Sequence, residues 1–308
     1  MAEHYEAVVI GGGPAGLTAG IYLMRAGINT ILLEKGIVGG SPLMTEHVEN
    51  YPGFPDGIAG KDLMARMAEQ AKRFGLVIRE FTGVEKIGRS EEQFEIEHGE
   101  GVFAANGVVV AVGTESAKLG IPGETEFAGR GVSYCATCDG MFFRNAKVAV
   151  VGGGDAAIQE ALTLANLASQ VYIVHRRGEL RAQKILQDRV FERGNMTVLW
   201  SRVPWEIKGK DQVESMVLKD TVTGEMTEMA VDGVFFYVGS HPSTAFLGNL
   251  VDRDEAGFIL TEEDLTTRTP GLFVAGDARK KLLRQVTTAV GDGALAAVGL
   301  ERYLLQTR

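Results

Sequence analysis

The chain has 308 residues, of which 45% are hydrophobic and 23% charged, and its formal net charge at pH 7 is −9. This length allows two ordinary domains with proper cores, and the acidic balance argues against nucleic acid as a ligand. No apolar run approaches the length of a spanning helix, and a strand follows directly after Met1-Ala2-Glu3-His4, which leaves no room for a signal peptide. We therefore expect a cytoplasmic protein without membrane or nucleic-acid partners.

The first element is a glycine-rich nucleotide fingerprint. Its apolar strand, glycine turn, apolar helix and second strand are expected at residues 7–10, 11–16, 17–26 and 30–33. In such a motif Gly11 makes the tight turn, Gly13 lets a pyrophosphate approach the backbone, and Gly16 allows close packing of helix on strand. Glu34 ends the second strand, 23 residues after Gly11. A carboxylate there can accept a hydrogen bond from a ribose hydroxyl.

Core and connecting elements follow. Residues 61–74 carry apolar side chains at helical spacing, which predicts a core-packed helix, and residues 94–97 alternate as in a half-exposed hairpin strand. A strand at 107–112 closes the first domain. The Gly- and Pro-containing stretch at 113–124 is typical of a linker.

The two cysteines of the chain stand in the sequence Cys135-Ala136-Thr137-Cys138, followed by Asp139. Two cysteines cannot complete a tetrahedral zinc site, and the five histidines supply no spaced pair, so we expect no metal. A redox-active disulfide fits better, because the thiolate is the reactive species and Asp139 could protonate or deprotonate the leaving thiol. The alternative is a pair of buried, inert cysteines that pack as small hydrophobes.

A second fingerprint follows the cysteines with the same spacing as the first. Its strand, glycine turn, helix and second strand are expected at residues 148–151, 152–157, 158–168 and 171–174. Gly152 and Gly154 repeat the roles of the first two glycines, and Ala157 takes the place of the third. Two fingerprints in register, each in its strand-turn-helix context, are much stronger evidence than one.

The residues after the second strand distinguish the two fingerprints. His175 lies 23 residues after Gly152, where the first copy has its glutamate, and Arg176, Arg177 and Arg181 follow. Arginine side chains match a phosphate, which a carboxylate would repel, so this copy should prefer NADP(H) to NAD(H). The alternative is a solvated basic patch. The first copy should then hold FAD, because a flavin is the natural relay between a hydride donor and a disulfide.

The C-terminal third returns to the first domain. An apolar strand at 234–238 ends the second domain, and residues 239–242 form the return linker. Residues 269–277 form a turn and a buried strand, and at its end Asp277 offers a carboxylate to a ribityl hydroxyl. The last helix, expected at 285–305, is rich in Gly and Ala, which suits close approach to a cofactor or subunit and plain helix packing equally.

These elements predict an α/β fold of two Rossmann-like, three-layer ββα dinucleotide-binding domains. The first domain is discontinuous and binds FAD, and the second is inserted into it, binds NADPH and carries the cysteine pair. The predicted ranges are 1–115 with 246–308, and 116–245.

Together, the two fingerprints, the Cys-Ala-Thr-Cys-Asp-Gly segment, His175-Arg176-Arg177, Gly276-Asp277 and Arg284-Gln285 resemble the low-molecular-weight thioredoxin reductases over essentially the whole chain. The resemblance implies a homodimeric flavoprotein that passes electrons from NADPH through FAD and a disulfide to a thioredoxin-like protein. It implies that Cys138 lies nearer the flavin, that Cys135 attacks the partner, and that Asp139 is the acid/base.

The resemblance and the fingerprints together give two sets of cofactor residues. For FAD they are Gly11, Gly13, Pro14, Ala15, Gly16, Glu34, Gly40, Asn50, Gly276, Asp277, Arg284 and Gln285. For NADPH they are Gly152, Gly154, Asp155, Ala156, Ala157, His175, Arg176, Arg177 and Arg181. The chain departs from the family pattern at Ser41-Pro42, where many members have Gln, and at Ala111-Val112-Gly113, where Ala-Thr-Gly is common.

Three other functions share parts of this pattern. A flavin-dependent dithiol oxidase of the same architecture would not need the arginines. A ferredoxin-type NADP reductase would have no use for the two cysteines. A nucleotide-sensing regulator could keep both fingerprints but would not be expected to keep the dithiol with Asp139.

Overall fold

The computed structural model describes residues 3–90 and 93–307, which form two compact units. Unit 1 comprises the chain up to residue 115 and from 241 onward, and unit 2 comprises residues 116–240. The second boundary thus lies five residues before the expected 245/246 division. Buried Thr244 explains the difference, because Arg253 of unit 1 donates to its hydroxyl at 3.2 Å and its carbonyl at 2.7 Å. The connecting stretches β7 (Glu115–Ser116) and β16 (Ser240–His241) pair with each other.

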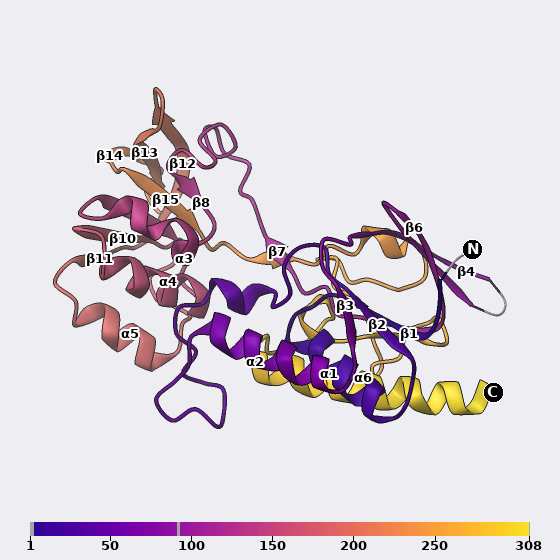
Figure 1. The fold of residues 1–308 in the computed structure, drawn as a ribbon. Coiled ribbons are helices and arrows are strands. Elements are labelled where there is room, and N and C mark those ends of the chain that lie inside the picture. Colours follow the sequence, from indigo (N-terminus) through magenta and orange to yellow (C-terminus); the bar gives the residue numbers. More distant parts are fainter. Residues whose placement is uncertain (1–2, 91–92, 308) are drawn as a thin grey trace. The chain divides into compact units, whose positions relative to one another are not determined.

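Unit 1 is built on a seven-stranded sheet in the order β3-β2-β1-β6-β5-β4, with β17 pairing the C-terminal half of β6 (Figure 1). Strands β1, β2, β3, β6 and β17 run parallel, and β4-β5-β6 form an antiparallel meander. The elements of this unit are β1 (Glu3–Ile10), α1 (Pro14–Arg25), β2 (Thr30–Leu33), η1 (Ser41–Met44), α2 (Gly60–Arg73), β3 (Val77–Arg79), β4 (Val84–Arg89), β5 (Phe94–His98), β6 (Gly101–Val110), β7 (Glu115–Ser116, at the boundary), β16 (Ser240–His241, at the boundary), η3 (Ala245–Leu247), β17 (Leu272–Val274), η4 (Gly276–Ala278) and α6 (Val286–Thr307).

Two cores lie on opposite faces of this sheet, because successive strand residues point to opposite sides. Val9 of β1 packs in the core made with α1, α2 and α6, and Val8 packs in the core made with β4, β5 and residues 246–259. Gly293 of α6 lies so close to α1 that a methyl group there would overlap the carbonyl oxygen of Ala15. At this position the small residue of α6 therefore serves helix packing.

Unit 2 repeats the three layers on a parallel sheet in the order β11-β10-β9-β15-β8. One face packs against α4 and α5, and the other against a three-stranded antiparallel sheet, β12-β13-β14. This sheet is the second β layer of the predicted ββα architecture, although the sequence analysis did not locate its strands. The elements are β8 (Val132–Ser133), α3 (Ala136–Asp139), η2 (Gly140–Phe143), β9 (Lys147–Val151), α4 (Asp155–Ala165), β10 (Gln170–Val174), α5 (Lys184–Phe191), β11 (Met196–Leu199), β12 (Arg202–Gly209), β13 (Val213–Asp220), β14 (Met226–Ala230) and β15 (Gly233–Phe236).

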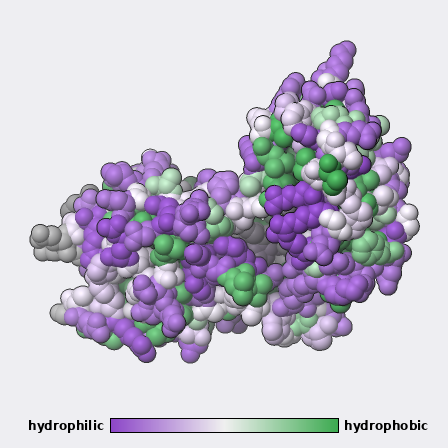
Figure 2. Space-filling model, turned by 180° about the vertical axis from the view of Figure 1, so that it is seen from behind, coloured by the Kyte–Doolittle hydropathy of each residue, from purple (hydrophilic) through white to green (hydrophobic). Residues whose placement is uncertain are grey.

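The surface seen in Figure 2 is mostly polar, with hydrophobic residues in small separate patches. None of the helices in the described part of the chain is both long and apolar enough to cross a membrane.

Candidate active site

The cysteine pair lies on a short helical turn at the end of β8. Cys135 and Cys138 form a disulfide with Cα atoms 5.4 Å apart, which confirms the predicted pairing. Cys135 caps α3, and its Sγ accepts a hydrogen bond from the backbone N–H of Cys138 at 3.0 Å. Cys138 is exposed and Cys135 half-buried, so the disulfide can be reached by a partner and is not an inert core pair. The same N–H would stabilise a thiolate on Cys135 after reduction.

Ser133 holds the acid/base candidate beside the disulfide. Its buried hydroxyl donates to Asp139 Oδ2 at 2.6 Å and accepts from the backbone N–H of Cys135 at 3.0 Å. One hydroxyl therefore links the carboxylate of Asp139 to the backbone of Cys135. The sequence analysis missed Ser133. A polar residue at the end of a short strand, two positions before the first cysteine, was the available signal.

The glycine turn of unit 2 has the shape that a dinucleotide fingerprint requires. Gly152 has φ 153°, and a methyl group there would come within 2.6 Å of both Ala157 Cβ and the carbonyl oxygen of Tyr237. Among the described residues, and apart from its two chain neighbours, none has an atom within 4 Å of a methyl group built at Gly154, so this residue leaves open space at the N-terminus of α4. An open, positively polarised helix end suits a pyrophosphate. Asp155 at the first position of α4 accepts from the backbone N–H of Gln183 at 2.7 Å.

The predicted NADPH residues after β10 divide into two groups. Arg176, Arg177 and Arg181 are exposed, and the backbone N–H of Arg181 donates to the carbonyl oxygen of Gly153 at 2.7 Å, which holds it beside the glycine turn. His175 is only 4% exposed, and its ring packs beneath Gly153. Burial, and then the charges of Arg181 and Arg177, lower the pKa of His175, so the ring supports the turn in its neutral form.

The glycine turn of unit 1 is more tightly packed. Gly11 has φ 106°, and a methyl group at Gly16 would overlap the carbonyl oxygen of Gly11, so only glycine fits between helix and strand. Gly13 and Gly40 approach each other closely, since a methyl group on Gly40 would lie 3.1 Å from Gly13 Cα. Pro14 and Ala15, also predicted for FAD, begin α1 after this turn.

Glu34 closes the unit 1 turn from below. Its Oε2 accepts from the backbone N–H of Gly12 at 2.6 Å, and its Oε1 accepts from that of Gly36 at 2.8 Å. Each carboxylate oxygen has two lone pairs, so both retain capacity for a ribose hydroxyl. Glu34 therefore fits the role the sequence suggested and also fixes the turn.

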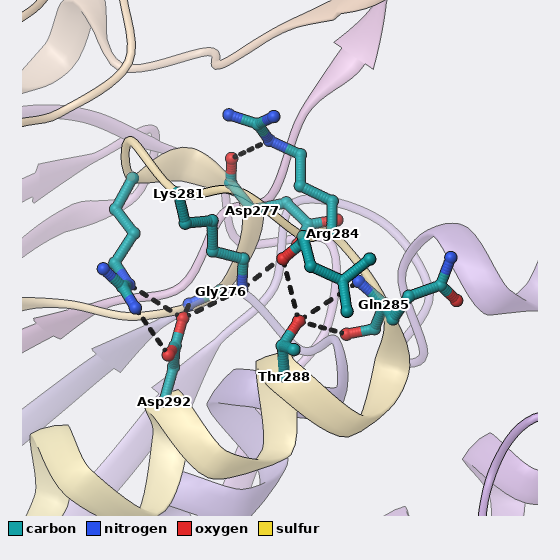
Figure 3. A network of polar contacts seen from close by, with 9 residues as sticks. Gly276, Asp277, Lys281, Arg284, Gln285, Thr288 and Asp292 are labelled. Carbon is teal, nitrogen blue, oxygen red and sulfur yellow. Dashed lines mark hydrogen bonds and ion pairs between the residues drawn. The ribbon is translucent and has the colours of Figure 1, made fainter. Parts of the chain in front are cut away.

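The turn after β17 is organised by Asp292 of α6, a buried residue that sequence analysis missed (Figure 3). Asp292 Oδ2 accepts from the Gly276 N–H at 3.0 Å and from Lys281 Nζ at 2.9 Å, and the guanidinium of Arg279 binds both carboxylate oxygens at 2.9 Å. Burial acts to raise the pKa of Asp292, but Arg279 and Lys281 outweigh it and lower the pKa. The Gly-Asp turn is thus fixed by a buried ion cluster.

Asp277 at this turn offers an acceptor that needs a donor. Burial raises its pKa, and its buried Oδ1 has no hydrogen-bond partner among residues 3–90 and 93–307, with Lys281 Nζ 3.6 Å away. A ligand hydroxyl would satisfy it. The guanidinium of Arg284 lies 3.9 Å from the centre of the Phe258 ring, and Asn50 donates to Gln285 at 3.1 Å. These predicted FAD residues are therefore gathered around the carboxyl ends of the unit 1 strands, where ligands bind in open α/β sheets.

Comparison with known proteins agrees with this geometry. Residues 5–293 match the model of the pyridine nucleotide-disulphide oxidoreductase family, and the chain belongs to this family. It is 43% identical to a thioredoxin reductase of Treponema pallidum, over 99% of this chain and 98% of the relative. It is 44% identical to a thioredoxin reductase of Bacillus subtilis, over 97% of this chain and 95% of the relative.

Solved structures give the same result. The crystal structure of Lactococcus lactis thioredoxin reductase superposes with a TM-score of 0.96 at 44% identity, covering 98% of this chain and 99% of that one. The crystal structure of T. acidophilum thioredoxin reductase superposes with a TM-score of 0.94 at 33% identity, covering 97% of this chain and 98% of that one. The α/β fold of two Rossmann-like units and the resemblance to thioredoxin reductases are confirmed, and the chain is an oxidoreductase.

Proposed function

We propose that this enzyme reduces the disulfide of a thioredoxin or thioredoxin-like protein with NADPH, using bound FAD. The observation that carries the proposal is an accessible Cys135–Cys138 disulfide, held with Asp139, in the same compact unit as an open glycine turn flanked by arginines. The disulfide would exchange with the disulfide of the protein partner, and the glycine turn would bind the electron donor NADPH. The similarity to thioredoxin reductases over nearly the whole chain supports the same assignment.

The unit 2 turn would hold NADPH by its phosphates. Gly152 and Gly154 leave the end of α4 open to the pyrophosphate, and Arg176, Arg177 and Arg181 are exposed to take the 2′-phosphate. Two arginine contacts at about 1–2 kcal/mol each would favour NADPH over NADH by roughly 30- to 1000-fold. The neutral ring of His175 would support the turn from beneath it.

The unit 1 turn would hold FAD. Gly11, Gly13 and Gly16 form the pyrophosphate turn, Glu34 accepts from a ribose hydroxyl, and Asp277 accepts from the ribityl chain. When bound, the flavin relays two electrons between the nicotinamide and the disulfide.

The two cysteines then carry out thiol-disulfide exchange. The Cys135 thiolate attacks one sulfur of the partner disulfide, and the other partner sulfur leaves as a thiolate that takes a proton. The Cys138 thiolate next attacks Cys135 Sγ, which restores the disulfide and releases the partner dithiol. Asp139 can exchange the protons, and the N–H of Cys138 stabilises the charge on Cys135.

An exposed apolar pair follows the disulfide and would contact the protein partner. Met141 is 60% exposed and Phe142 84% exposed, on η2 directly after α3. Apolar side chains at the rim of a reactive disulfide suit the apolar surface that surrounds a partner disulfide, because their burial adds affinity at the point of exchange. Phe142→Ala should raise the KM for the partner while leaving NADPH oxidation by a small disulfide reagent unchanged.

The decisive test is anaerobic addition of NADPH to the purified yellow protein, followed by thioredoxin. Flavin bleaching by NADPH, and then thiol release from thioredoxin, are expected. A dithiol oxidase would instead be bleached by a substrate dithiol and show no preference for NADPH.

Two further parts of the proposal concern the setting of the enzyme. A dithiol that works in reduced form suits a reducing compartment, so we place the enzyme in the cytoplasm, which cell fractionation would test. The family resemblance predicts a homodimer, which analytical ultracentrifugation would test.

A further inference from the structure

Tyr237, at the end of β15, lies against the disulfide turn within unit 2. Its hydroxyl oxygen accepts a hydrogen bond from the backbone N–H of Ala136 at 2.9 Å, and the hydroxyl donates to Glu160 Oε2 at an oxygen-oxygen distance of 3.5 Å. Ala136 is the first residue of α3 and stands between the two cysteines. Its N–H is one of the donors that a helix N-terminus leaves without an intrahelical acceptor. Tyr237 supplies that acceptor.

The backbone of Tyr237 is fixed to the nucleotide turn. Its N–H donates to the carbonyl oxygen of Val151 at 2.8 Å, and its own carbonyl oxygen closes over Gly152 so tightly that a methyl group there would lie 2.6 Å away. Val151 and Gly152 are the last strand residue and the first glycine of the second fingerprint. One residue therefore contacts both the nucleotide turn and the disulfide turn.

The surroundings of the Tyr237 hydroxyl keep it protonated and hold it in position. Burial, and then the neighbouring carboxylate of Glu160, raise the pKa of Tyr237 far above its ordinary value. Glu160 is itself 8% exposed, and Ala136 is 1% exposed. Without the hydroxyl, the Ala136 N–H would remain in a buried place without this acceptor, which is costly.

We propose that Tyr237 is a positioning residue that fixes the disulfide turn to the first glycine of the nucleotide turn. A closed disulfide requires both cysteines at a fixed separation, whereas a dithiol does not. Tyr237 therefore favours the disulfide. The backbone of Tyr237 also packs against Gly152. A nucleotide bound at that turn and the oxidation state of the cysteine pair therefore influence each other, and this second part rests on the proposed nucleotide site.

The first experiment measures the equilibrium between the enzyme disulfide and dithiothreitol. In this exchange the enzyme gains two thiols as dithiothreitol forms its cyclic disulfide, and alkylation of the free thiols counts the product. Tyr237→Phe removes one oxygen and should shift the equilibrium toward the dithiol by about two- to tenfold. Glu160→Gln should shift it less, in the same direction. Tyr172→Phe, a half-buried tyrosine of β10 that packs in the other core of the unit, should leave it unchanged.

An unchanged equilibrium in folded Tyr237→Phe would overturn the positioning role, and so would an equal shift in the Tyr172 control. The measurement uses neither NADPH nor thioredoxin, so its outcome is independent of the proposed function. Thermal unfolding of each variant shows whether a shift reflects the site or general loosening of the fold.

The second experiment tests the coupling with adenosine 2′,5′-bisphosphate, a redox-inert probe for the arginine-flanked turn. In the native enzyme its dissociation constant should differ between the disulfide and dithiol forms by about fivefold, and by reciprocity the probe should shift the dithiothreitol equilibrium by the same factor. Tyr237→Phe should abolish the difference. Equal affinities for the two native forms would overturn the coupling, whereas failure of the probe to bind either form would contradict the proposed nucleotide site.

Discussion

The two nucleotide turns have the same backbone plan but different supports. In unit 1 the residue after the second strand is Glu34, whose side-chain oxygen Oε2 accepts from the N–H of Gly12. In unit 2 it is His175, whose neutral ring packs beneath Gly153. Both side chains therefore support the middle glycine of their turn. What differs is the chemistry offered to a ligand. Glu34 retains hydrogen-bond acceptors, which would suit a ribose, whereas unit 2 has exposed arginines beyond the turn, which would suit a phosphate.

The third position of the fingerprint differs as well. Gly16 packs against the carbonyl of Gly11 with no room for a methyl group, whereas Ala157 has its methyl group beside Gly152. The same motif thus holds alanine in unit 2 at the position where unit 1 has room only for glycine. In both units the third residue of the fingerprint packs against the first glycine of the turn. The space between them decides whether that third residue is glycine or alanine.

The largest loss of activity is expected from a change in the cysteine pair, which is present in unit 2 and has no counterpart in unit 1. Cys138→Ser should abolish reduction of thioredoxin, a loss of at least about a thousandfold, while NADPH still bleaches the flavin, because hydride delivery requires no sulfur. Stopped-flow absorbance and a steady-state assay measure the two half-reactions. Thr137→Ser is the matched control and should retain both. Loss of flavin bleaching in Cys138→Ser would contradict the separation of the two roles.

The next effect tests the ligand difference between the turns. Replacing Arg176 and Arg177 together by Ala should raise the KM for NADPH by roughly 30- to 1000-fold and change the KM for NADH little, since only NADPH carries the 2′-phosphate. Arg193→Ala, an exposed arginine after α5, is the control. Equal losses for both coenzymes would show that the arginines bind no phosphate.

A smaller effect tests the third position of each turn. Gly16→Ala should cost about 1–3 kcal/mol and lower FAD retention, because the new methyl group overlaps the Gly11 carbonyl. The reverse change in unit 2, Ala157→Gly, should cost only about 1 kcal/mol, mainly from helix propensity. Thermal unfolding and the ratio of flavin to protein absorbance measure both. Full FAD retention in Gly16→Ala would mean that the two turns pack alike.

The smallest effect is a difference in pH dependence. The pKa of His175 is lowered from 6.5 by burial and then by Arg181 and Arg177, so its folded form favours the neutral ring. The stability it contributes is present above pH 6.5 and is lost as pH falls below that value. The pKa of Asp292 is lowered from 3.8, so its contribution is present above pH 3.8 and is lost only as pH falls further.

Urea unfolding between pH 8 and pH 3 should therefore lose stability in two stages. In His175→Gln, the loss of unfolding free energy below pH 6.5 should become smaller. In His4→Gln, a change at an exposed histidine, that loss should be the same as in the native protein. A first stage that persists in His175→Gln would place its origin in another group.

The sequence predicted the repeated units well, because glycine turns and apolar strands are local signals. Strand β2 lies at the expected residues 30–33, and α2 at Gly60–Arg73 lies within one residue of the expected 61–74. The predicted pairing of Cys135 and Cys138 also followed from their spacing. A second β layer was expected, but the strands of the β12-β13-β14 sheet were not located in the sequence. In β12, a register break between Pro204 and Glu206 interrupts the alternation that marks a strand.

Sequence reasoning selected the site residues by the chemistry of their side chains. The pairing of Cys135 with Cys138 is confirmed, whereas the roles of Asp139, Glu34 and the arginines stay predictions. The supports of the site were decided by the tertiary structure alone. Ser133, Tyr237 and Asp292 are ordinary polar residues in the sequence, and their roles arise because folding brings them to a buried N–H or charge that needs a partner. Sequence therefore determined which chemistry the protein carries. Only the three-dimensional packing decided which neighbours hold that chemistry in place, because hydrogen bonds between distant segments leave no periodic pattern in the chain.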